Sequence, residues 1–426
     1  MLGVSNLGAQ RSAGAGTRAS AGVPVAQSRP AYQLPPEKLQ RAIEYTRRRT
    51  VLEFGFVGWG MLQLVGLLSL GVAARMRDIA VKLSAKRWVQ GYGFVIELAL
   101  VTSLLNLPVQ VYGHHLSLEY GQSVQGWGSW LVDHAKSFGL TVVVGGVLVL
   151  LLFWVMDKSP RRWWFWFWVP ATVLMVAGVF LAPIVIDPIF NKFEPLAATN
   201  PALVARVEQV VARGGIVIPP ERMFLMKASA KYTGQNAYVT GLGASKRVVV
   251  WDTSVAKASP DEISFIFAHE MGHYVLSHIY RGMLFAAVVM LVLFWLGYHG
   301  MQWLLGRYGA GWGIAGQWDW AALVVLLLVI SVLSFVSDPI TNGFSRGMEH
   351  EADVYGQEAI HGIVADPQAV AEHSFQVMGE ESLDDPNPNR LVEFWTFDHP
   401  STSSRAAFAA GYDPWGVGGH PKYFKR

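Results

Sequence analysis

Long, nearly uninterrupted apolar runs separated by polar segments dominate the 426-residue chain. A bilayer core about 30 Å thick requires about 20 mostly apolar residues in one helix. Six runs fit this requirement, at residues 54–74, 93–111, 138–156, 163–186, 282–305 and 320–335. The fourth run opens with the tryptophan-rich segment WWFWFW, as expected at a membrane–water interface. The pattern therefore predicts six membrane-spanning helices.

The polar region between the fourth and fifth runs, residues 187–281, has the pattern of a small α+β unit. Asn200 and Pro201 are typical of a helix start, and the apolar positions of LVARVEQVV share one helix face. The segments MFLMKAS, NAYVT and KRVVVW predict short strands. Ser259 and Glu262 are spaced as a capping box around Pro260. They predict a second helix that continues almost to the fifth apolar run.

The composition supports the membrane assignment and excludes chemistry that depends on cysteine. The chain is 52% hydrophobic and 15% charged, whereas soluble domains carry about 25% charged residues. The net charge of +3 and the lack of a basic stripe give no indication of a nucleic-acid partner. The absence of cysteine excludes disulfides, thiolate metal ligands and a cysteine nucleophile. Glu97, inside the second run, should face the protein interior or a water-filled cavity, with structural pairing favoured over a substrate role.

The segment HEMGH carries the strongest chemical signal. His269 and His273, four residues apart on the predicted helix, lie about 40° apart around its axis. This spacing suits two ligands of one zinc ion. Glu270 is then placed as general base toward a water at the metal, and it can pass the proton to a leaving amine. The alternative is a buried helix with ordinary histidine hydrogen bonds, which the capping box and the motifs below make less favourable.

The third metal ligand must come from another segment. On a continuous helix His278 lies about 140° from His273, so we predict a structural or hydrogen-bonding role for it rather than ligation. Glu349 and Asp353, four residues apart after the sixth run, share a helix face. Glu349 would complete a His2Glu site with an open fourth position, and Asp353 could accept a hydrogen bond from a metal-bound histidine. The alternatives are His350 as ligand and a solvated charged face.

Motifs along most of the chain resemble the integral-membrane zinc endopeptidases of the type I CAAX prenyl protease family. The resemblance covers roughly residues 39–405, and it depends on the order and spacing of the motifs, because only HExxH is specific alone. They are LPVQVYGHHLSLEYG followed by Trp130, Asp133 and Lys136, then PIFNKFEPL, NAYVTG, KRVVVWDT, HEMGHYVLSH, SRGMEHEAD and DHPSTSSR.

The resemblance implies roles for further residues. Glu349 matches the third zinc ligand and Asp353 the acid beside it, with one Zn²⁺ per chain. NAYVTG matches an edge strand that binds an extended peptide through Asn236, Ala237 and Tyr238, consistent with strand addition. A turn role is the alternative for Asn236. His399 and Arg405 match groups that hold substrate and stabilise the developing oxyanion, with packing at a helix start as the alternative.

The expected fold class is an all-α polytopic membrane protein with a small α+β zinc metalloprotease domain of the HExxH gluzincin type. By resemblance, about six helices form a hollow barrel around a chamber. The expected regions are a disordered tail (1–35), with a transit peptide as the alternative, a four-helix membrane domain (36–186), a catalytic region with the edge strand and HExxH helix (187–281), two further spans (282–338), a segment with the third ligand and the C-terminal catalytic residues (339–410), and a tail (411–426).

The expected function is membrane-embedded, zinc-dependent cleavage of peptides or proteins, lipidated C-terminal peptides among them. The alternatives are a broad-specificity quality-control protease and a transporter or scaffold with structural zinc. Six spans instead of the eukaryotic seven and no C-terminal retention signal favour a bacterial plasma membrane over the endoplasmic reticulum. The resemblance implies a cytoplasmic active site. Arg47, Arg48 and Arg49 agree with this orientation, but the basic residues of 75–87 and 158–162 oppose it.

Overall fold

The computed structural model describes residues 32–216, 218–241 and 246–424, and in this part of the chain six helical segments are long and apolar enough to cross a membrane. Each contains most of one predicted apolar run, so the prediction of six spans is confirmed. They are α1 (Pro36–Ser69), α3 (Arg87–Glu119), Trp127–Lys158 with α4 (Trp127–Leu140) and α5 (Gly146–Lys158), Trp163–Phe190 with α6 (Trp163–Leu181) and α7 (Asp187–Phe190), α12 (His278–Tyr308) and α13 (Ala322–Ala359).

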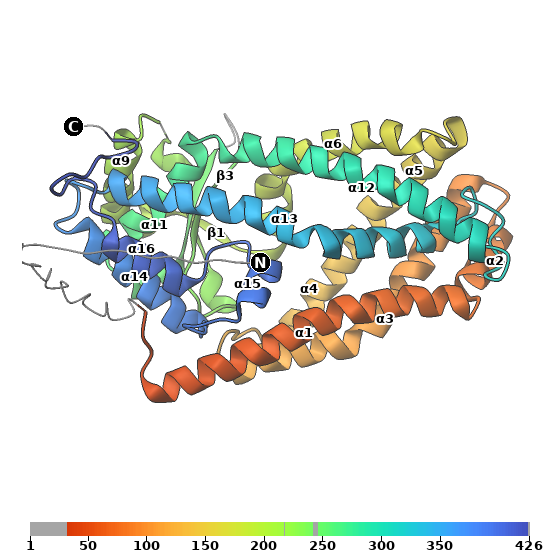
Figure 1. Cartoon of the computed structure of the whole chain (residues 1–426), viewed down its shortest axis with the longest axis horizontal. Helices are drawn as coiled ribbons and strands as arrows, with labels where there is room; N and C mark the ends of the chain where they lie inside the picture. The colour runs from red at the N-terminus through yellow and green to blue at the C-terminus, as the bar shows by residue number, and fades with distance from the viewer. Residues whose placement is uncertain (1–31, 217, 242–245, 425–426) are drawn as a thin grey trace, which may run out of the picture.

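The membrane helices extend from one end of an elongated molecule (Figure 1). The sheet and the helices around it occupy the other end, next to the second half of α13. α12 runs along α13, and the rings of Phe285 and Phe344 stack between them with centroids 4.0 Å apart. α2 (Val72–Leu83), which was not predicted, follows α1 after Gly71, whose φ of 67° turns the chain.

Four short strands form one sheet in the order β1-β2-β4-β3. They are β1 (Phe193–Pro195), β2 (Met223–Met226), β3 (Ala237–Thr240) and β4 (Arg247–Trp251). β2 and β4 are parallel, whereas β1 pairs with β2 and β3 with β4 in antiparallel fashion. The three predicted strands are confirmed. β1 was missed because three residues ending in proline carry no alternating pattern.

The helices around the sheet begin where the capping residues predict. Asn200 Oδ1 accepts from Leu203 N at 3.2 Å at the start of α9 (Pro201–Arg213). Ser259 and Glu262 form the predicted capping box of α11 (Pro260–Val275). The remaining helices are α8 (Leu196–Thr199), α10 (Asp252–Lys257), α14 (Pro367–Ser382), α15 (Arg390–Thr396) and α16 (Thr402–Gly411), with 3₁₀ turns at Pro220–Arg222 and Ala228–Ala230.

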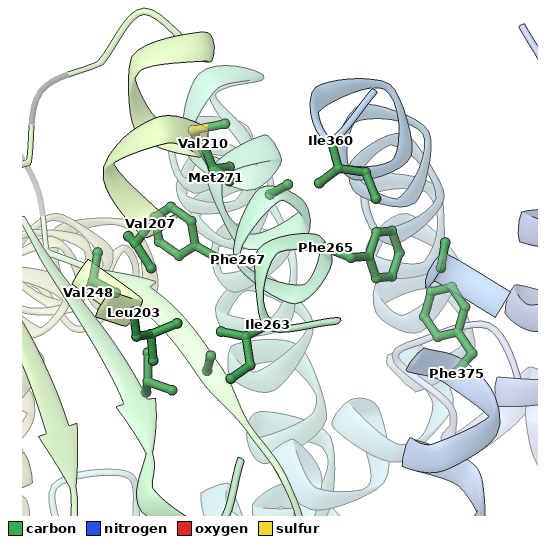
Figure 2. Close-up of a cluster of buried hydrophobic side chains, with 14 of the residues drawn as sticks. Leu203, Val207, Val210, Val248, Ile263, Phe265, Phe267, Met271, Ile360 and Phe375 are labelled. Atoms are coloured by element: carbon green, nitrogen blue, oxygen red, sulfur yellow. The ribbon is translucent and has the colours of Figure 1, made fainter. Parts of the chain in front are cut away.

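Helix α11 lies in the centre of a cluster of buried hydrophobic side chains next to the sheet (Figure 2). One of its faces, with Ile263, Phe267 and Met271, packs toward α9 and β4. The opposite face presents Phe265 to Phe375 of α14, with ring centroids 5.3 Å apart. Burial on both faces fixes the helix that carries HEMGH, because displacing it would expose apolar surface on two sides.

Both ends of the described chain are packed against this core. Residues 32–35, predicted to belong to a disordered tail, contact the core instead: Tyr32 is buried and donates to the Asp384 carbonyl at 3.0 Å. The rest of the predicted tail, residues 1–31, lies outside the described residues. At the other end, buried Glu358 of α13 accepts from the Tyr412 hydroxyl and from the backbone N–H groups of residues 422–424. These hydrogen bonds of the C-terminal segment were not predicted from its glycine- and proline-rich composition.

Glu97 does not have the structural partner that was expected. Its Oε2 atom is buried, and no group in the described part of the chain donates a hydrogen bond to it. The pairing prediction is therefore wrong for the described residues.

Candidate active site

The side chains of HEMGH meet one carboxylate from α13. His269 Nε2 lies 3.2 Å from His273 Nε2 and 3.2 Å from Glu349 Oε2, and His273 Nε2 lies 3.4 Å from Glu349 Oε1. Among the described residues, His269, His273 and Glu349 are the group whose ligand atoms converge, all within 4.8 Å of one another. The sequence-predicted trio is thus brought together.

Glycines allow α11 and α13 to approach closely enough for this convergence. A Cβ on Gly356, two turns after Glu349, would lie 2.9 Å from the backbone nitrogen of His269. A Cβ on Gly272 would lie 3.1 Å from Tyr355 Cβ and 3.3 Å from the Cα of Ala352. Side chains at either glycine would separate the two helices, and therefore the carboxylate from the imidazoles.

The ring nitrogen of His269 that does not contact Glu349 is held by a carboxylate. Its Nδ1 lies 2.9 Å from Asp353 Oδ1, as predicted for Asp353. Arg405 donates to both oxygens of Asp353, from Nε at 2.9 Å and from Nη2 at 2.6 Å. The Arg405 guanidinium also stacks over Phe375, 4.5 Å from the ring centroid. An Nδ1–H that donates to Asp353 leaves the Nε2 lone pair of His269 for a metal.

His278 lies beside His273, although the helical spacing placed it elsewhere. α11 ends at Val275, and Ser277 has a φ of 61° before α12 begins at His278. This break turns the imidazole of His278 back, so that its Nδ1 is 3.0 Å from His273 Nδ1. The predicted role next to the site agrees with this position, but the assumption of a continuous helix was wrong.

A cavity of about 260 Å³ lies beside His269. Glu270 lines it, and burial raises the pKa of its carboxyl above the usual value. His399 and Arg405 line it as well. His399 Nε2 lies 3.3 Å from Glu349 Oε2, and its Nδ1 contacts Asp398 at 2.8 Å. Burial opposes protonation of His399, but Asp398 and Glu349 outweigh it and raise its pKa.

The donor set fits a metal cation. Two imidazole nitrogens and two carboxylate oxygens face one another at contact distance, an arrangement that a cation shared among them would stabilise. Glu349 Oε2 is buried and accepts no hydrogen bond, although both His269 and His399 are near it. An unpaired buried carboxylate oxygen is costly. Nitrogen and carboxylate ligands without thiolate are typical of zinc and related divalent ions.

The strand that was matched to substrate binding lies at the edge of the sheet. β3 pairs only with β4 among the described strands, and Asn236 precedes it at the rim of the cavity. Trp251 N donates to Asn236 O at 3.0 Å. Because hydrogen-bonded pairs alternate in an antiparallel ladder, the polar groups of Tyr238 and Thr240 point toward β4. Those of Ala237 and Val239 therefore face the open edge.

Three further residues near the site were not predicted in the positions they occupy, and the alternative ligand His350 does not join the converging group. His350, the rival ligand, is exposed and packs its ring against Phe408, with centroids 4.6 Å apart. Phe375 and Asp398 were missed because a phenylalanine under an arginine and an aspartate beside a histidine leave no periodic signal. Glu351 was missed as well, and its Oε2 lies 3.0 Å from His278 Nε2.

Comparisons with known proteins agree with this geometry. Residues 19–192 match the CAAX prenyl protease N-terminal model, described as five membrane helices, and residues 197–412 match peptidase family M48. The chain is 32% identical over 383 residues to the metalloprotease YhfN of Bacillus subtilis, covering 90% of this chain and 88% of that protein. It is 32% identical over 207 residues to CAAX prenyl protease 1 of Saccharomyces cerevisiae, covering 48% and 45%.

A solved structure shares the fold. The crystal structure of S. mikatae Ste24p superposes with a TM-score of 0.76 at 23% identity, covering 88% of this chain and 89% of that one. The expected fold class, polytopic helices with a small α+β peptidase unit, is therefore confirmed. From the family model over its second half and the relative that matches nearly its whole length, the chain belongs to peptidase family M48, as a membrane-embedded metallopeptidase of the CAAX prenyl protease type.

Proposed function

We propose that this metallopeptidase binds one Zn²⁺ through His269, His273 and Glu349 and cleaves peptides beside the membrane. The observation that carries the proposal is the convergence of three ligand side chains on one point, with a buried Glu349 oxygen that lacks a hydrogen bond. Zinc, when bound, supplies a Lewis acid that makes water nucleophilic at neutral pH. A closed structural site would use four protein ligands, whereas three converge among the described residues.

Within this proposal, other side chains at the site transfer the proton, orient His269 and stabilise the developing negative charge. Glu270, which lines the cavity, takes a proton from the attacking water and returns it to the leaving nitrogen. Asp353 holds His269 in the tautomer that presents Nε2. Arg405 and His399 line the cavity and supply positive charge where the carbonyl oxygen becomes negative.

The substrate would bind as an added strand on β3. The backbone polar groups of Ala237 and Val239, which point away from β4, and the position of Asn236 at the cavity support this mode. Replacing Val239 by proline removes an N–H from the open edge without removing a β3–β4 hydrogen bond. We expect kcat/KM for a peptide to fall about tenfold and the metal content to stay unchanged. The reason is that the substrate loses one backbone hydrogen bond and meets the proline ring at the edge of β3.

The matched control for the strand is Val239→Ala, which keeps the N–H and shortens the side chain. Steady-state cleavage of a fluorogenic peptide by both variants separates backbone pairing from side-chain contact. Equal kcat/KM for Val239→Pro and Val239→Ala would rule out pairing at this position.

We further propose that the substrates are peptides cut near their C-terminus, lipidated CAAX-type peptides among them. The names of the yeast, plant and other relatives support this class, while a broad-specificity protease remains the alternative. The test is mass-spectrometric mapping of cleavage sites in farnesylated CAAX peptides, their unlipidated forms and unfolded membrane-protein segments. We expect cuts confined to the CAAX-like ends. Cuts scattered through all three sets would favour quality-control proteolysis instead.

The proposed location is a bacterial plasma membrane with the active site on the cytoplasmic side. An even number of spans places both ends of the six-helix region on one side, together with the sheet. The chain has no native cysteine, so single cysteines introduced near the sheet and in the far loops can be labelled in intact cells. Labelling near the sheet by an impermeant reagent would exclude the cytoplasmic orientation.

A further inference from the structure

A chain of contacts runs from the second histidine of HEMGH to an arginine on the next helix. His278, the first residue of α12, is 3% exposed, and its Nδ1 lies 3.0 Å from His273 Nδ1. Its Nε2 lies 3.0 Å from Glu351 Oε2 on α13. Arg281 donates to the same Glu351 oxygen at 2.6 Å. Two successive contacts thus connect His273 to the ion pair between Glu351 and Arg281.

The donor and acceptor roles along this chain follow from one condition. If His273 uses Nε2 for the metal, its proton must lie on Nδ1, which then donates to His278. His278 Nδ1 must be the acceptor, so the proton of His278 lies on Nε2 and is donated to Glu351. Glu351, acceptor only when ionised, is also the acceptor for Arg281. Every contact then has one donor and one acceptor.

His269 is held by a similar series of contacts. There, Nδ1 meets Asp353 directly, and Asp353 is paired with Arg405. Each histidine is therefore backed by a carboxylate of α13 that is itself paired with an arginine. The difference is that His278 is inserted as a spacer between His273 and Glu351. The spacer reaches His273 only because Ser277 adopts a φ of 61°.

We propose that His278, anchored by Glu351 and Arg281, is a positioning residue that fixes the tautomer and ring orientation of His273 for metal binding. This inference rests on the proposed function, in which His273 is a ligand. Partners of this kind typically account for about 10- to 100-fold in metal affinity. His278 does not touch the metal or the substrate, so its effect acts through His273.

The test measures zinc affinity of the purified full-length protein by competition with a chromogenic chelator. We expect His278→Phe, which keeps a ring but no hydrogen bond, to weaken zinc binding about 10- to 100-fold. His278→Asn, whose Oδ1 can accept from His273 near the original Nδ1 position, should recover most of the affinity. Absorption of the Co²⁺-substituted protein should shift in His278→Phe and return toward wild type in His278→Asn.

The matched control is His350→Phe, the same substitution at an exposed histidine next to Glu349. Wild-type affinity in His278→Phe, together with wild-type affinity in Glu351→Ala, would overturn the proposal. Should His278→Phe not fold, Glu351→Ala decides alone, because that side chain is partly exposed. His273→Ala separates the proposed function from the positioning role of His278. If His273→Ala retains zinc, the proposed ligand set is wrong. If His273→Ala loses zinc while the His278 variants bind zinc as tightly as wild type, only the positioning role is refuted.

Discussion

Replacing Glu270 by glutamine is expected to lower peptide hydrolysis at least about a thousandfold while leaving the metal bound. The reason is positional: Glu270 lines the cavity, but it does not belong to the three side chains whose ligand atoms converge. Glutamine has nearly the same shape as glutamate, yet it cannot take a proton from water. The cavity, the ligands and the fold should therefore persist without turnover.

The experiment compares single-turnover cleavage and metal content, by atomic spectroscopy, in the purified variant and wild type. Glu208→Gln is the matched control, because it makes the same substitution at an exposed position of α9. Hydrolysis retained by Glu270→Gln at more than a few per cent of wild type would contradict the general-base assignment. Loss of the metal in this variant would instead indicate that Glu270 helps to hold it.

Replacing Glu349 by glutamine is expected to remove both the metal and the activity. Tetrahedral structural zinc sites bind with about 10–16 kcal/mol in all, so one ligand in four accounts for about 3 kcal/mol. That loss corresponds to at least about a hundredfold weaker binding. The buried amide would also place an NH₂ group or a weaker oxygen donor where the converging imidazole nitrogens require a cation.

Metal content after dialysis against a chelator decides this prediction. Wild type should retain one equivalent of zinc per chain, Glu349→Gln close to none, and His350→Phe the wild-type amount. The control is adjacent in sequence but points to Phe408. One zinc retained by Glu349→Gln and lost by His350→Phe would transfer the third ligand to the alternative residue.

Much of this site could be predicted because its parts follow local rules. The capping box places the start of α11, the spacing of four places two histidines on one face, and the same spacing links Glu349 and Asp353. The apolar runs predict the spans between these segments. Each inference depends on a few neighbouring residues and on the regular geometry of a helix.

The features that were missed depend on single backbone angles or on contacts between distant segments. His278 reaches His273 because one serine adopts a positive φ, which no periodic pattern reports. Tyr32 contacts a carbonyl 352 residues away in the sequence. Arg405 was matched to the oxyanion by resemblance, but its bidentate pairing with Asp353 became visible only in three dimensions.

The unbroken helix α13 has a mechanical consequence. It runs as one helix from Ala322 in the membrane to Ala359 in the peptidase unit, with Pro339 inside it. At a rise of 1.5 Å per residue, its membrane end and Glu349 lie about 40 Å apart along the same helix. A bilayer that is too thin or too thick tilts a membrane helix. We therefore expect lipid chain length to change the tilt of the helix that also carries the third ligand residue.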